Sequence, residues 1–390
     1  MDTTEQTKKP DAFKAPNMNH WYELEASDNN DKLQINKAQD DLKNMLLASL
    51  QMQHLVVLAG SGCSISAGGP SMQKLWSEVV GAPPKNDAQE IASRVNYKID
   101  DKNIEAFLSK VEAFLQVNKD KAVCNFLKNS KKIILDQCSS FLNVNKLNAH
   151  KIFLHRLSRR RIRDQRLQVF TTNYDICFER AAAELGGVAL DGFSFISPRR
   201  YDPRFFRYDI IRRPHTGEAV GHYLEGVFLL NKLHGSVNWA RSKEGTIYEK
   251  DTPTPGEACL IYPAMGKYQQ SFDQPYLESL AQYLTAVREP NTCILVVGFG
   301  FNDNHLAEPL LAAVESNPHL RLIVVDSNAM QQEKKKNRFW NCLFNLSTNG
   351  EDIWFINMSF NDFANIIPDL KSLTPADTLM KAIKDVTREP

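Results

Sequence analysis

Six apolar runs of strand length constrain the fold of this 390-residue chain more than any other feature. They occupy residues 54–59, 167–172, 227–233, 293–297, 320–325 and 353–358. Strands buried on both faces are continuously apolar, as in a parallel sheet covered by helices. Amphipathic helical patterns separate the runs, at residues 37–51, 71–80, 174–185, 276–289 and from Asp362 onward. The sequence therefore predicts an α/β fold with a parallel sheet and helices on both faces.

The residues outside these runs predict insertions and flexible ends. Residues 87–165 show helical periodicity without a strand pattern, which predicts a helical insertion. Residues 188–226 are rich in Arg, aromatic residues and Pro, and residues 240–275 carry turn residues, so both segments predict irregular insertions. We therefore divide the chain into a flexible N-terminal arm (1–32), one main domain (33–373) and a C-terminal tail (374–390).

The composition excludes several classes of protein. Hydrophobic residues make up 43% and charged residues 24%, as in soluble globular proteins. With 47 basic and 46 acidic residues the net charge is +1, so direct nucleic-acid binding is not expected. No apolar run is long enough to cross a membrane, and the polar N-terminus is no signal peptide. Seven scattered cysteines without a C-x-x-C pair argue against disulfides and a zinc ribbon. These features predict a cytoplasmic protein without membrane contact.

The first run ends in a glycine turn at Gly60, Ser61 and Gly62. Glycines let the backbone turn sharply and approach a ligand, and a following helix start offers N–H groups to a phosphate. This arrangement predicts a site for the pyrophosphate of a dinucleotide, although an ordinary strand-to-helix turn would look similar. Ile65 stands where the dehydrogenase fingerprint G-x-G-x-x-G requires its third glycine.

Polar or glycine-rich residues also end four further runs. They are Thr172 with Asn173, His234 with Gly235, Gly298 with Gly300, and Asp326 with Ser327. In parallel α/β sheets, ligands bind beyond the carboxyl ends of the strands. We therefore expect these residues and the glycine turn to converge on one crevice.

Taken together, these strand ends resemble the sequence boxes of the sirtuin family. The segment from Gly60 to Pro70 matches the glycine box, 171–175 matches Thr-x-Asn-x-Asp, and 232–236 contains His-Gly-Ser. Residues 297–301 correspond more loosely to a Val-Gly-x-Ser box. The resemblance covers roughly residues 50–330 and implies a Rossmann-like domain that uses NAD.

Departures from the deacylases of that family point to a different branch. Ser71, Met72 and Gln73 stand where deacylases have Asp-Phe-Arg, the four-cysteine zinc ribbon is missing, and Gly300 replaces a frequent Ser. The chain is more similar to sirtuin-like effectors of bacterial antiviral defence, which hydrolyse NAD. Its compact size is similar to the subgroup that partners a HerA-type hexameric ATPase.

The resemblance implies an NAD+ glycohydrolase that depletes NAD as a defence effector within an oligomer. NAD is then a substrate, and neither a prosthetic group nor zinc is expected. An NAD-dependent deacylase or ADP-ribosyl transferase, and a non-catalytic NAD-binding scaffold subunit, stay open as alternatives.

Two residues are predicted to carry the chemistry. Nicotinamide is already a cationic leaving group, so the reaction needs an aligned water or hydroxyl and a base to take its proton. His234 is the predicted base, because imidazole titrates near neutral pH. Asn173 can both donate to and accept from the ribose or the water. Each could instead be structural, His234 as a satisfied core histidine and Asn173 as a turn residue.

The other predicted site residues are assigned to parts of NAD. We expect backbone N–H groups and hydroxyls of the glycine box to hold the pyrophosphate. Asp175 could fix the Asn173 loop or the nicotinamide end, or merely cap a helix. The full set of predicted NAD-binding residues is Gly60, Ser61, Gly62, Ser64, Pro70, Thr172, Asp175, Gly298, Gly300 and Asp326, the last three on the adenosine side.

Overall fold

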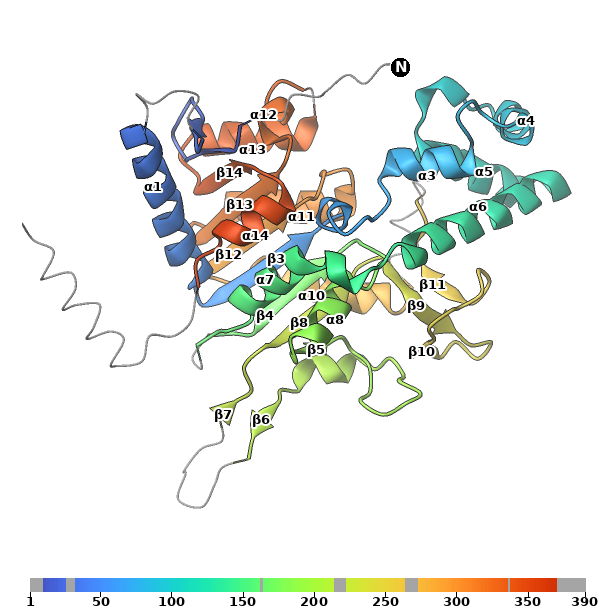
Figure 1. The fold of residues 1–390 in the computed structure, drawn as a ribbon. Helices are drawn as coiled ribbons and strands as arrows, with labels where there is room; N and C mark the ends of the chain where they lie inside the picture. Colours follow the sequence, from blue (N-terminus) through green and yellow to red (C-terminus); the bar gives the residue numbers. More distant parts are fainter. Residues whose placement is uncertain are drawn as a thin grey trace, which may run out of the picture.

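A nine-stranded sheet forms the centre of the protein (Figure 1). The computed structural model describes residues 10–25, 32–161, 164–213, 222–263, 273–335 and 337–369. The strand order is β2-β1-β14-β13-β12-β3-β4-β8-β5, and all pairings from β14 to β5 are parallel. The strands are β1 Ala12–Lys14, β2 Tyr22–Glu23, β3 His54–Ala59, β4 Leu167–Thr171, β5 Val188–Leu190, β8 Val227–Lys232, β12 Thr292–Val297, β13 Leu320–Asp326 and β14 Ile353–Asn357. The predicted parallel α/β sheet is confirmed, and its six predicted strands agree with the structure to within a residue.

Alternate side chains of each central strand enter two different cores, one on each face of the sheet. In β3, Leu55 and Val57 face one core, whereas Val56 and Leu58 face the other. The first core is covered by α1 (Lys32–Leu50), α7 (Asn148–Leu157), α8 (Cys177–Glu184) and α14 (Phe360–Ile366). The second is covered by α10 (Tyr276–Ala286), α11 (Asn304–Ser316), α12 (Ala329–Gln332) and α13 (Arg338–Thr348). This double coverage explains why the strands are apolar without alternation.

The helical insertion forms a third core beside the sheet (Figure 1). Its helices are α3 (Met72–Val79), α4 (Asn86–Arg94), α5 (Ile104–Val117) and α6 (Lys121–Ser140). The insertion predicted at residues 87–165 begins earlier and ends earlier in the structure. α3 packs into the insertion core through Leu75 and Trp76, whereas α7 packs on the sheet through Phe153 and Leu157. Burial of these side chains, which periodicity does not reveal, decides where each helix belongs.

The predicted irregular insertions contain short strands. β9 (Gly235–Arg241), β10 (Ile247–Glu249) and β11 (Ala258–Leu260) form a separate antiparallel sheet next to the insertion helices. In the other insertion, β5 extends the main sheet, and β6 (Ile211–Arg212) pairs with β7 (His222–Tyr223). Strands of two or three residues are too short to show a period in the sequence.

Part of the expected N-terminal arm belongs to the edge of the sheet. β1 pairs antiparallel with β14, and β2 pairs with β1. Phe13 is 3% exposed, and the Lys14 ammonium forms an ion pair with Glu333. Pairing with a distant strand orders this polar segment, so the expectation of a flexible arm does not hold for residues 12–23. The tail at 374–390 lies outside the described residues.

Candidate active site

A cavity of about 750 Å³ lies at the carboxyl ends of β3, β4, β8 and β12. Residues 102–106, at the start of α5 in the helical insertion, face it across these strand ends. Most of the predicted site residues line it, namely Gly60, Ser61, Ser64, Pro70, Thr172, Asn173, Asp175, His234 and Gly300. The predicted convergence of strand ends thus occurs for four of the five segments.

Gly62 and Gly298 do not line the cavity but pack against each other. A Cβ added to Gly62 would lie 2.6 Å from the Cα of Gly298, and the converse contact is as short. The Gly62 N–H donates to the Gly298 carbonyl at 3.0 Å. These glycines therefore bring the turn after β3 against the end of β12, which shapes one wall of the cavity.

The glycine turn is not an open phosphate cradle. The N–H groups of Gly60, Gly62 and Ser64 donate to the carbonyls of Val297, Gly298 and Ser61, respectively. These three donors are engaged within the protein, and binding of the pyrophosphate at this turn stays a prediction. Ser61 and Ser64 line the cavity.

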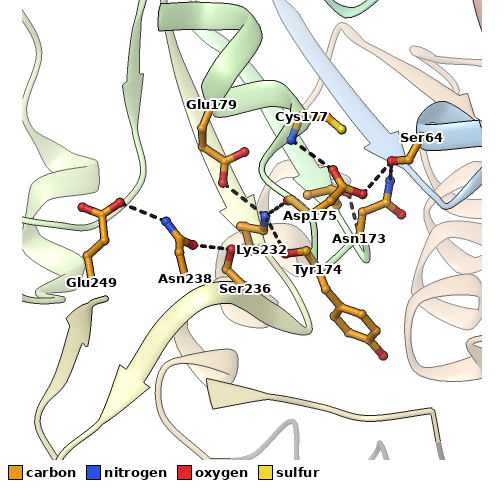
Figure 2. Close-up of polar contacts among 11 residues, drawn as sticks. Ser64, Asn173, Tyr174, Asp175, Cys177, Glu179, Lys232, Ser236, Asn238 and Glu249 are labelled. Atoms are coloured by element: carbon orange, nitrogen blue, oxygen red, sulfur yellow. Dashed lines mark hydrogen bonds and ion pairs between the residues drawn. The ribbon is translucent and has the colours of Figure 1, made fainter. Parts of the chain in front are cut away.

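Asn173, Ser64 and Asp175 form one hydrogen-bonded group (Figure 2). The Asn173 Nδ2 donates to the Ser64 Oγ and to the Gly60 carbonyl, both at 2.9 Å. The Ser64 hydroxyl in turn donates to the Asp175 carboxylate at 2.6 Å. The Asn173 side chain is therefore held against the glycine turn, and Asp175 both orients Ser64 and accepts from the Cys177 N–H at 3.0 Å.

A buried lysine supports this loop from beneath, as Figure 2 shows. Lys232, the last residue of β8, is 1% exposed, and its ammonium donates to the Asp175 carbonyl and to the Tyr174 carbonyl at 3.4 Å. Its counter-ion is Glu179 at 3.1 Å, on α8. Burial raises the pKa of Glu179, and the charge of Lys232 opposes that rise. Sequence reasoning gave Lys232 no role, although a lysine inside an apolar run was a signal.

His234 lies on the cavity wall where β8 passes into β9. Its ring is 2% exposed, and its carbonyl accepts from the Ile261 N–H at 2.9 Å. Gly235 has a φ of 81°, and a Cβ there would lie 2.0 Å from the Cys259 carbonyl oxygen. Only glycine fits this close crossing of β9 and β11, which fixes the backbone next to His234.

Two further residues are the predicted Asp326 and Cys63, a neighbour of the predicted residues in the glycine turn. The Asp326 carboxylate accepts from the Asn328 N–H at 2.7 Å and is not among the cavity-lining residues. It is the last residue of β13, which β12 separates from β3, so its assignment to adenosine stays a prediction. The thiol of Cys63 donates to the Val297 carbonyl, and burial raises its pKa far above the ordinary value. A thiol held protonated in this way is no nucleophile.

The second candidate residue that sequence reasoning missed is His305, near the start of α11. Its Nε2 lies 3.4 Å from the Nε2 of His234. Within the described ranges, no group of three or more His, Cys, Asp or Glu side chains is arranged to hold a metal ion. None of the described helices is long and apolar enough to cross a membrane.

One protein-family model matches part of the chain. Residues 167–345 match the SIR2-like domain family. The match spans somewhat less than half of the chain and includes Asn173, Lys232, His234 and His305. No curated protein sequence matches the chain.

Among solved structures, the chain is similar to Sir2 homologues. One, a Sir2 homologue in complex with NAD, has 14% identity and a TM-score of 0.42 over 88% of this chain and 94% of that chain. Another, a mutant Sir2 homologue in complex with ADP ribose, has 13% identity and a TM-score of 0.43 over 89% of this chain and 99% of that chain.

Proposed function

We propose that this protein hydrolyses NAD at the bond between nicotinamide and ribose, giving nicotinamide and ADP-ribose. The observation that carries the proposal is the shared cavity. Asn173 and His234, from two different strand ends, line it together with the glycine turn. The SIR2-like match over residues 167–345 supports NAD as the ligand.

The chemistry follows from what each side chain can do. Departure of nicotinamide leaves an electron-poor ribose carbon, and the attacking water has to be aligned with it and deprotonated. His234 is buried on the cavity wall and serves as the base. Asn173 has its Nδ2 committed to Gly60 and Ser64, so its carbonyl oxygen is the group that accepts from the ribose or the water.

We further propose, from the sequence resemblance, that the hydrolysis serves antiviral defence in an oligomer with a HerA-type ATPase. The exposed aromatic and apolar side chains around the Arg-rich segment 193–211 suit a protein contact of this kind. They include Phe195, Ile196, Tyr208 and Ile211.

The test is product analysis with purified protein. NAD is incubated with the chain alone and with the ATPase, and nicotinamide and ADP-ribose are separated by chromatography. His234→Ala and Asn173→Ala should each lower nicotinamide release at least about 100-fold, the usual scale for loss of acid–base or aligning groups. His319→Ala, at an exposed histidine, is the matched control and should keep wild-type turnover.

Other results would assign a different function. Turnover that requires an acyl-lysine peptide or a protein acceptor would show a deacylase or transferase. Stoichiometric NAD binding without nicotinamide release, in the chain and in the complex, would show a scaffold subunit.

A further inference from the structure

A second imidazole meets the predicted base. The Nε2 atoms of His234 and His305 lie 3.4 Å apart, and their ring centroids are 5.4 Å apart with the planes inclined by 33°. His234 lines the cavity and is 2% exposed, whereas His305 is half-buried and is not a lining residue. His305 therefore contacts His234 from outside the cavity lining, and it is more exposed to solvent than His234.

The two facing nitrogens are close enough for one proton to join them. A neutral imidazole has one N–H and one lone pair, so at this distance one Nε2 donates and the other accepts. Protonating both rings would place two positive charges side by side, which is strongly disfavoured. At this distance the tautomer of His234 therefore depends on that of His305.

The charges around the pair act in opposite directions on an added proton. His305 lies in the first turn of α11, where the helix dipole disfavours a cation. Carboxylates on the cavity wall oppose that effect, and they outnumber the one ammonium there. The ionisable groups that line the cavity besides His234 are Asp175 after β4, Asp303 before α11, Glu105 and Lys102 at the start of α5, Cys138 on α6, and Tyr174.

Resting on the proposed NAD hydrolysis, we propose that His305 is the positioning residue that sets the tautomer of His234 and receives its proton. Water forms a bond to the ribose carbon as the bond to nicotinamide breaks, and the electron pair of that bond leaves with nicotinamide and neutralises its ring. The Nδ1 of His234 takes the proton of the water, while the proton on the Nε2 of His234 moves to the Nε2 of His305. His305 then releases it to solvent, so NAD and water give nicotinamide, ADP-ribose and one proton.

Kinetics of His305→Gln test this role. Glutamine keeps a hydrogen-bonding group near Nε2 but takes no proton, so kcat should fall about 10- to 100-fold, while KM for NAD stays within about twofold. The ionisation that limits kcat at acidic pH should also shift. His319→Gln, the same change at an exposed histidine, should leave all three quantities at the wild-type values.

A double variant separates action through His234 from an independent effect. If His305 acts through the base, His234→Ala/His305→Gln should be no slower than His234→Ala alone. Losses that multiply, or an unchanged kcat in His305→Gln, would overturn the proposal.

Nitrogen-15 NMR of the histidine rings gives a readout that needs no turnover. In the wild type, His234 should titrate together with His305 and show one dominant tautomer, and His305→Gln should change both. An unchanged tautomer and pKa of His234 would refute the role of His305. A wild type that releases no nicotinamide, alone or in complex, would refute the hydrolysis itself while the NMR result still decides whether the two rings are coupled.

Discussion

His150 makes the folded protein less stable as the pH falls below neutral. The residue lies on α7, is fully buried, and contacts the edges of Phe178 and Phe360 at centroid distances of 5.1 and 5.0 Å. In the part of the chain that the structure describes, neither ring nitrogen has a hydrogen-bond partner. Burial lowers the pKa of His150 to about 4, and the negative charge of Asp175 opposes this shift only in part.

The sign of the effect follows from the depressed pKa. The unfolded chain takes a proton on this histidine below its ordinary pKa of 6.5, whereas the folded chain does not until about pH 4. The stabilisation is therefore complete above pH 6.5 and is lost as the pH falls toward 4. At 1.36 kcal/mol per pKa unit, the loss at pH 5 is about 2 kcal/mol, and it approaches about 3 kcal/mol at pH 4.

Urea unfolding at pH 7.5 and pH 5.0 measures this loss. His150→Leu has a side chain of similar volume and no titrating group, so other ionisations cancel when it is compared with the wild type. The free energy of unfolding of the wild type should fall about 2 kcal/mol further than that of His150→Leu. At pH 7.5 the variant should be as stable as the wild type or more stable, because it removes two buried nitrogens without partners. Equal pH dependence in the two proteins would refute the reasoning, and His319→Leu serves as the exposed control.

Two further substitutions test the supports of the site. Lys232→Met removes the buried cation under the Asn173 loop and leaves Glu179 without its counter-ion, so the free energy of unfolding should fall by about 3 kcal/mol. Adding Glu179→Leu to this variant should restore part of the lost free energy of unfolding. If urea unfolding shows Lys232→Met to be as stable as the wild type, the assigned ion pair is contradicted. Gly235→Ala places a Cβ 2.0 Å from the Cys259 carbonyl oxygen at a positive φ, and should cost about 2 kcal/mol or more. A thermal unfolding midpoint equal to that of the wild type would show that β9 and β11 leave room for a side chain at this crossing.

Local sequence patterns were enough to locate the central strands and the part of the cavity wall that their carboxyl ends form. Each central strand is a run of aliphatic residues because helices cover both faces of the sheet. The residues that follow each run lie at the carboxyl end of a strand, whatever the order of the strands. Asn173 and His234 were found this way, since parallel strands bring their ends to one edge. Short strands such as β1, β5 and β10 were missed, because two or three residues carry no period.

The sequence by itself determined the parallel sheet, its burial on both faces and the polar strand ends, because these depend on periodicity and on residue type. Only the tertiary structure decided which groups meet across those ends. It placed the Lys232 ammonium under the Asn173 loop and His305 against His234, and it engaged the N–H groups of the glycine turn within the protein. Such contacts join residues tens to hundreds of positions apart, and the distances that set hydrogen bonds and shared protons exist only after the chain has packed.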